Sequence, residues 1–213
     1  MPNEFIGLAE ETGLIKPLTD WVVSAALGQC GLWRQRNLDV SISINVPTPM
    51  LQSSFFLYTL EGHWGSLDLD PACLTLEVTE TTLMREPDYS VQLLDRLRAM
   101  GVRLCIDDFG TGYSSLSHLQ RLAVHELKTD RSFVRDLERA PGDAAIVRST
   151  IDLAHRLGLR VVAEGVEDAE TWRLLCELGC DAAQDFFVSP SLEAGEATRW
   201  LVQRPAIAVP PEA

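Results

Sequence analysis

The 213-residue sequence contains no run of about 18 uncharged apolar residues, so no segment is predicted to span a membrane. Its first residues, Met1 to Glu4, also lack the basic and then apolar pattern of a secretory signal peptide. These two absences favour a soluble protein of the cytoplasm.

Cysteine pairs are missing as well. The five cysteines are odd in number and form no pair separated by two residues, and most lie within apolar runs. This pattern is typical of reduced core thiols rather than of a disulfide framework. The residues are Cys30, Cys73, Cys105, Cys176 and Cys180.

Positive charge is scarce. The chain has 18 Lys and Arg against 31 Asp and Glu, which gives a formal net charge of −13. Such a surface opposes binding to DNA or RNA, because few cationic side chains are present to replace the counterions of the phosphate backbone. If the ligand is nevertheless an anionic phosphate, bound cations must lie between it and the protein.

With 46% apolar residues the chain can bury a large core, and we expect one domain over residues 1–203. Residues 204–213, with three prolines, are predicted to be a disordered tail. From residue 40 onward, β-branched runs alternate with amphipathic helical patterns, which favours a (β/α) barrel or a doubly wound sheet. The expected strands are Val40–Asn45, Leu74–Glu80, Arg103–Phe109, His125–Asp130, Arg160–Glu164 and Asp181–Phe187.

Apolar spacing predicts helices over Asp88–Met100 and Asp143–Leu157. Three glycines each follow a helical pattern and precede a strand, where a left-handed residue ends a helix at low cost: Gly101, Gly158 and Gly179. Nearer the start, Thr19 is a candidate N-cap for a helix that runs to about Arg36.

Polar residues occur where buried strands end. Together they are Asn45, Glu77, Asp107, Asp108, Lys128 and Glu164. Carboxylates that meet in a low dielectric require compensating cations. In barrel enzymes the catalytic groups come from the carboxyl ends of the strands, and oxygen ligands without His or Cys favour Mg²⁺ or Mn²⁺. Alternatively, each residue is only the solvated start of a loop.

The residues from Phe5 to Leu192 resemble the EAL-domain phosphodiesterases of bacterial cyclic-di-GMP signalling. The resemblance is carried by Phe5–Ile15, Ser43–Val46, Leu76–Glu80, Ile106–Ser115, Leu127–Phe133 and Val161–Glu167, in the order of the family. The string from Asp107 to Ser115 is the most specific of these.

The resemblance implies metal ligands at Asn45, Glu77, Asp107, Asp108 and Glu164. It implies that Lys128 and Gln184 contact or orient the attacking water, with Glu164 also counted in the catalytic group. Around them, supporting positions are expected at Glu80, Glu167, Asp130, Gly110, Thr111 and Gly112. The implied substrate is cyclic di-GMP and the product linear pGpG, formed by in-line attack of water at two divalent cations.

In the family, two strands precede the helix near Phe5, and they carry the Glu-Ala-Leu signature and an arginine. The 213 residues contain neither, so we expect an incomplete TIM-like (β/α) barrel of six strands, with impaired metal and substrate binding. Exposed sheet edges then favour a homodimer. The family also implies sensor or GGDEF domains in a longer parent chain. Three positions depart from the family pattern: His125 stands where the family commonly has aspartate, Thr129 where it has an aliphatic residue, and Asp185 where glycine usually follows the glutamine.

Other functions remain open at this point. The chain is a candidate for an inactive module that binds cyclic di-GMP or a protein partner without turnover. Lys128 at a strand end also permits a Schiff-base lysine, although the neighbouring carboxylates would keep its amine charged. Gly110 to Gly112 lacks the ending of a nucleotide P-loop and is expected to be a mobile loop.

Overall fold

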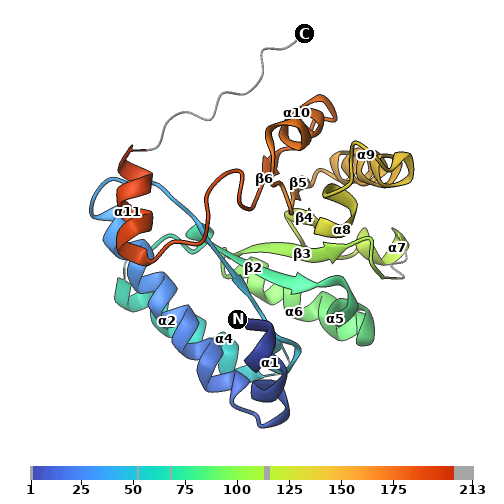
Figure 1. The fold of residues 1–213 in the computed structure, drawn as a ribbon. Helices are drawn as coiled ribbons and strands as arrows, with labels where there is room; N and C mark the ends of the chain where they lie inside the picture. The colour runs from blue at the N-terminus through green and yellow to red at the C-terminus, as the bar shows by residue number, and fades with distance from the viewer. Residues whose placement is uncertain (1, 52, 68, 113–115, 204–213) are drawn as a thin grey trace. The chain divides into compact units, whose positions relative to one another are not determined.

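The computed structural model describes residues 2–51, 53–67, 69–112 and 116–203. Within them, strands β1 to β6 follow one another in chain order in a six-stranded sheet (Figure 1). The strands are Ile42–Asn45 (β1), Leu74–Thr79 (β2), Arg103–Phe109 (β3), Glu126–Thr129 (β4), Arg160–Ala163 (β5) and Ala182–Ala183 (β6). Each lies within the segment predicted for it, whereas the predicted tail lies outside the described residues.

Helices occupy most of the connections between strands. The α-helices are Pro2–Glu11 (α1), Ile15–Arg34 (α2), Thr48–Leu51 (α3), Ser54–Leu67 (α4), Glu80–Arg85 (α5), Pro87–Ala99 (α6), Leu116–Leu119 (α7), Arg131–Val134 (α8), Pro141–Arg156 (α9), Ala169–Glu177 (α10) and Ala194–Gln203 (α11). A 3₁₀ turn, η1, covers Pro71–Cys73 and leads into β2.

The chain divides into two compact units, which are described separately. The first contains residues up to Val78 together with Asp88–Leu104. In it α2 packs against α3, α4 and β1, and the side chains of Val23, Leu27 and Leu60 are almost fully buried. Strands β1 and β2 are parallel, with Asn45 opposite Glu77 at the last residue pair.

The second unit contains Thr79–Pro87 and the residues from Cys105 onward. Strands β3 to β6 pair in parallel, and α9 lies against β4 and β5. Val147, Ile151 and Ala154 recur on the buried face of α9, as the helical period of the sequence predicts. This helix therefore packs against the two strands that position Lys128, which lies in β4, and Glu164, which directly follows β5.

Glycines end three of these helices as predicted. Gly101, Gly158 and Gly179 have φ values of 88°, 73° and 80° after α6, α9 and α10. At Gly158, the following Leu159 donates its N–H to the carbonyl of Ala154 at 2.9 Å, which satisfies a carbonyl at the end of α9.

The predicted N-cap at Thr19 is wrong. Helix α2 already begins at Ile15, and Pro17 lies in its first turn, where the missing N–H of proline carries no cost. The Thr19 hydroxyl donates to the carbonyl of Ile15 at 2.8 Å, so it bonds backward within the helix instead of capping it.

None of the five cysteines, all of which lie within the described residues, forms a disulfide; Cys30, Cys73 and Cys105 are buried, and the other two are half-buried. No helix in the described part of the chain is both long and apolar enough to cross a membrane.

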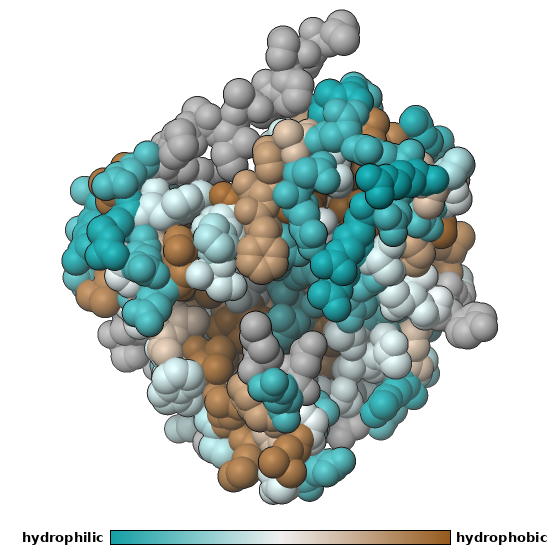
Figure 2. Space-filling model, viewed as in Figure 1, coloured by the Kyte–Doolittle hydropathy of each residue, from teal (hydrophilic) through white to brown (hydrophobic). Residues whose placement is uncertain are grey.

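In the first unit, exposed apolar residues include Phe5, Leu8 and Leu14. Figure 2 shows brown side chains gathered at the lower edge of the view, over α1 and the start of α2.

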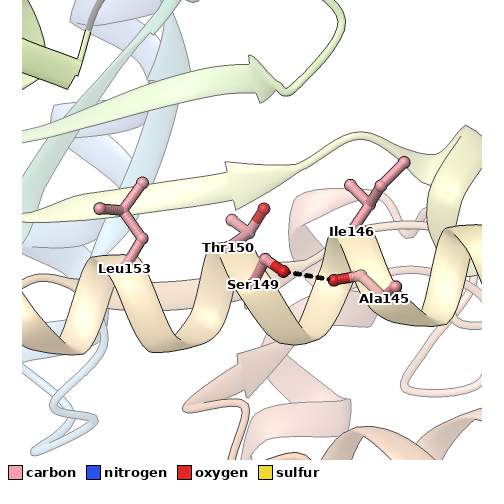
Figure 3. A pocket seen from close by; sticks show the side chains of 5 residues that line it. All are labelled: Ala145, Ile146, Ser149, Thr150 and Leu153. Carbon is pink, nitrogen blue, oxygen red and sulfur yellow. Dashed lines mark hydrogen bonds between the residues drawn. The ribbon is translucent and has the colours of Figure 1, made fainter.

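A shallow pocket of about 320 Å³ lies along α9 in the second unit (Figure 3). Its lining residues are Ala145, Ile146, Ser149, Thr150 and Leu153. The Ser149 hydroxyl donates to the carbonyl of Ala145 at 2.7 Å and is therefore already engaged. Because no charged side chain lines this pocket, it offers nothing to hold a phosphate or a cation.

Candidate metal centre

Two adjacent acids, Asp107 and Asp108, lie at the end of β3. Consecutive residues of a regular strand point to opposite faces, so they would not normally meet at one site. The pairing of β3 with β4 shifts between Ile106 and Phe109, which gives β3 one residue more than its partner. Asp108 also has a φ of 55°, in the left-handed region that aspartate tolerates. This bulge lets both carboxylates lie on the same side.

The carboxylate of Glu164 completes a cluster with these two acids. One oxygen from each of Asp107, Asp108 and Glu164 lies within 4.8 Å of the others. Glu164 follows β5 directly, and its N–H donates to the carbonyl of Thr129, the last residue of β4. Three carboxylates from two strand ends therefore converge.

Lys128 brings a single cation to this cluster from β4. Its Nζ atom lies 3.5 Å from Asp107 Oδ1 and forms an ion pair with Glu164 Oε1, and its side chain is only 3% exposed. Since one ammonium faces three carboxylates, negative charge remains in excess when all of them are ionised. An excess of this kind in a partly buried cluster is costly unless further cations are bound.

The electrostatics of Asp108 show the same excess. Partial burial, and then the negative charges of Asp107 and Asp130, raise the pKa of the Asp108 carboxyl. Asp130, which shares a side-chain hydrogen bond with Asp108, caps α8 by accepting the N–H of Ser132 at 2.9 Å. Although burial acts in the opposite direction, the hydrogen bonds from Ser132 lower the pKa of Asp130.

The donor set fits a hard divalent cation. It consists of carboxylate oxygens, and neither His nor Cys belongs to the cluster. Oxygen-only ligand sets suit Mg²⁺ or Mn²⁺, whereas zinc sites in proteins usually include His or Cys. Asp107, Asp108 and Glu164 could each contribute one oxygen to such an ion.

The loop after β3 is tied to Glu80. The N–H of Gly110 donates to Glu80 Oε2 at 2.9 Å, and Glu80 is 1% exposed. A Cβ atom at Gly112 would lie 3.0 Å from Glu80 Oε1, so a larger residue there would press on this carboxylate. The Thr111 hydroxyl donates to the carbonyl of Asp108 at 2.9 Å. The loop is thus held close to the bulge.

Three further residues named in the sequence analysis lie in loops of this unit: Glu167 after β5, Gln184 after β6 and His125 before β4. Glu167 pairs with Arg135 at 2.7 Å on the exposed surface. Gln184 is exposed, and its N–H donates to the carbonyl of Ala163 at 2.8 Å, which places it beside the end of β5. His125 precedes β4 and bonds through its carbonyl to the N–H of Arg160, at the strand ends opposite the cluster.

In the first unit, Asn45 and Glu77 are direct partners at the ends of β1 and β2. Partner residues of parallel strands project to the same face, so the two side chains share one side of this strand pair. Glu77 is 5% exposed, which is unusual for a carboxylate, while Asn45 is exposed.

One group of contacts was not predicted. Gly165 has a φ of 82°, and a Cβ atom there would lie 2.7 Å from Arg131 Cβ, so only glycine fits. Its N–H donates to Asp185 Oδ2 at 2.7 Å. The departure of Asp185 from the family pattern was the only indication of this contact in the sequence.

Comparison with known proteins identifies the family. The sequence profile described as the EAL domain matches residues 1–191. The chain belongs to the EAL-domain family. It is 38% identical over 205 residues to the signaling protein YkoW of Bacillus subtilis, covering 96% of this chain and 26% of that protein. It is also 38% identical to the cyclic di-GMP phosphodiesterase PA2567 of Pseudomonas aeruginosa, covering 94% of this chain and 34% of the relative.

A solved EAL-family structure agrees with the fold. The PaMucR phosphodiesterase, solved as a c-di-GMP complex, superposes with a TM-score of 0.90 at 40% identity, over 92% of this chain and 80% of that one. The predicted fold class, an incomplete (β/α) barrel, is confirmed, with six strands among the residues that the structure describes. The chain spans only about a quarter to a third of the length of the two curated relatives.

Proposed function

We propose that this EAL domain hydrolyses cyclic di-GMP to linear pGpG with the help of two divalent cations, Mg²⁺ or Mn²⁺. The observation that carries the proposal is the cluster of Asp107, Asp108 and Glu164 around the buried Lys128. Relatives of similar sequence are named cyclic di-GMP phosphodiesterases, which supports the same substrate class for this chain.

Within this proposal, the carboxylates of Asp107, Asp108 and Glu164 hold the cations, and Asn45 and Glu77 supply further oxygen ligands, as the family resemblance implies. When bound, such cations lower the pKa of a bound water and neutralise charge on the phosphodiester. The acidic chain itself repels an anionic substrate, so substrate binding should depend strictly on added divalent cations.

Lys128 has a separate role in the proposal. Its ammonium group is buried and fixed by Asp107 and Glu164, so it offers a positive charge that needs no reorganisation during the reaction. We place its Nζ next to the attacking water, where it stabilises hydroxide or assists the proton transfer from that water. Gln184, at the neighbouring strand end, would orient the same water.

Purified protein with Mn²⁺ and cyclic di-GMP tests the proposal, with product separated by chromatography. Linear pGpG should form with Mn²⁺ and not with a chelator. Glu164→Gln should remove most of the activity, and Glu138→Gln, which makes the same change at an exposed position, should not. Absence of pGpG even at high protein concentration would contradict hydrolysis by this chain.

Calorimetry with cyclic di-GMP separates turnover from binding. Binding without product would support the alternative, an inactive binding module, whereas undetectable binding would remove both. Because the Glu-Ala-Leu signature is not among the 213 residues, we expect weaker metal binding and lower activity than in a chain that carries it. The same assays measure that difference.

Self-association and attached domains are further parts of the proposal. The exposed apolar residues Phe5, Leu8 and Leu14 support contact with a second copy, and light scattering should give the mass of a dimer or larger assembly. A homogeneous monomer would contradict this. Sensor or GGDEF domains in a longer parent chain are proposed from the family alone.

A further inference from the structure

Asp185 has the largest positive φ of the non-glycine residues that the structure describes. Its φ is 111°, whereas the two other non-glycine residues with positive φ, Asn37 and Asp108, have 59° and 55° and lie in the left-handed well. That well extends only from about 50° to 70°. Strain of this kind persists where surrounding contacts enforce it, and it concentrates at functional sites.

Several hydrogen bonds enforce the conformation of Asp185. Its Oδ2 accepts the N–H of Gly165 at 2.7 Å, and its carbonyl accepts the N–H of Val188 at 2.9 Å. In the preceding residue, the N–H of Gln184 donates to the carbonyl of Ala163, and its carbonyl accepts the N–H of Val166. The chain after β6 is therefore joined to the chain after β5 at consecutive residues.

The bond from Gly165 matters because of what precedes it. The N–H of Gly165 and the carbonyl of Glu164 belong to one planar peptide unit. Because the N–H of Glu164 is itself bonded to the carbonyl of Thr129, fixing the N–H of Gly165 restricts ψ of Glu164. On its other side Gly165 packs closely against Arg131, whose Cβ lies 2.7 Å from the position of a Cβ atom at residue 165. The Glu164 backbone is thus held in one orientation, the one that brings its carboxylate to Lys128 and Asp107.

We propose that Asp185 is a positioning residue for the cation-binding carboxylate of Glu164. The proposal rests on the metal site of the proposed function and adds a residue to it. The carboxylate of Asp185 clamps the peptide unit between Glu164 and Gly165, and the strained backbone at Asp185 is retained because it aims the carboxylate at that N–H. Glycine at this position would remove the strain and also the clamp.

Three variants separate positioning from simple stabilisation. Asp185→Gly loses the carboxylate and relieves the backbone, so its melting temperature should stay equal or rise. Its affinity for Mn²⁺, titrated alone by calorimetry, should nevertheless fall by about tenfold, as for other residues that orient metal ligands. Asp185→Asn retains an oxygen acceptor and should recover most of the affinity. Asp185→Ala should lose both affinity and stability.

Hydrogen exchange of the Gly165 amide, measured by NMR without divalent cations, gives a readout independent of metal binding. Exchange should accelerate in Asp185→Gly and remain slow in Asp185→Asn. Equal Mn²⁺ affinity in Asp185→Gly and the unaltered chain would overturn the positioning role. If the unaltered chain binds no Mn²⁺ although Gly165 is protected, the metal site of the proposed function fails, and the role proposed for Asp185 fails with it.

Discussion

Two aspartates flank the short strand β6 and make the same kind of contact at opposite ends of β5. Asp181 accepts the N–H of Val161 at 2.8 Å near the start of β5, and Asp185 accepts the N–H of Gly165 at 2.7 Å just after its end. Asp181 also lies 2.9 Å from His155 Nε2 and has no unusual φ, whereas Asp185 has a φ of 111°.

The difference between these contacts agrees with the roles of the two strand ends in barrel folds, where the carboxyl ends carry the active site and the amino ends contribute to stability. At the amino ends of the strands a contact can be built without strain, because its only task is to hold the strands together. At the carboxyl ends a side chain such as that of Asp185 must point in one direction to reach its partner, and an unfavourable backbone conformation persists where the surrounding contacts enforce it. Changes at the two ends should therefore separate stability from function.

The largest effect is expected for Lys128→Met at the carboxyl end. Removing the ammonium leaves Asp107 and Glu164 facing each other without it, so the cation-free protein should lose about 3–5 kcal/mol of unfolding free energy. Mn²⁺ should then raise the melting temperature more than it does in the unaltered chain. Hydrolysis should fall by about a hundredfold or more.

Lys16→Met is the matched control, because the other lysine of the chain is exposed. It should change neither the melting temperature nor hydrolysis. If Lys128→Met kept full activity, the role proposed for its ammonium would be wrong.

Asp181→Ala should produce the opposite pattern at the amino end. It leaves the N–H of Val161 without its acceptor, which should lower the unfolding free energy by about 1–3 kcal/mol in urea titrations. Mn²⁺ affinity and the rate of hydrolysis should stay unchanged. A loss of metal affinity equal to that of Asp185→Gly would abolish the distinction between the two ends.

Low pH should weaken the contact of Asp181 with Val161 in the unaltered chain. Burial acts to raise the pKa of Asp181, but the N–H of Val161 and the nearby His155 and Arg160 outweigh it and lower the pKa overall. A carboxylate whose pKa is lower in the folded protein than in the unfolded chain stabilises the fold at any pH above its unfolded pKa of about 3.9. This contribution is lost as the pH falls through the pKa of the folded state. The stability advantage over Asp181→Asn should therefore shrink between pH 5 and pH 3, measured by urea titration.

The smallest effect is expected at Gly158, also on the amino side of β5. A Cβ atom there meets nothing within 4 Å, so Gly158→Ala should cost only the strain of its φ of 73°, about 1 kcal/mol. Gly142→Ala, inside α9 and equally open, is the control and should be neutral or slightly stabilising. Neither change should alter Mn²⁺ affinity.

The strands and the helix ends at Gly101, Gly158 and Gly179 could be predicted from the sequence, because the spacing of apolar residues and the position of a glycine determine structure within a few residues. It was misleading at Thr19, whose side chain competes between capping and bonding within the helix. Register could not be predicted. The extra residue in β3 that brings Asp107 and Asp108 together appears only when β3 is paired with β4.

The contacts between loops were equally hidden. Asp185 stood out only as a replacement for a family glycine, and nothing in the local sequence indicated that its carboxylate reaches Gly165, twenty residues earlier in the chain. By contrast, Asp107, Asp108 and Glu164 could be assigned to one edge of the sheet in advance, because each lies at or just after the carboxyl end of a recognisable strand. Residues at strand ends are predictable in this fold, and the bonds that orient them are not.

The extra residue in β3 has a consequence for how this chain can change. Between Ile106 and Phe109 a substitution alters one side chain, but a deletion would realign β3 with β4 and turn one of the two acids toward the opposite face. The length of this segment is therefore constrained as tightly as the identity of Asp107 and Asp108, and variants of the domain should tolerate the loss of a residue here no better than the replacement of either acid.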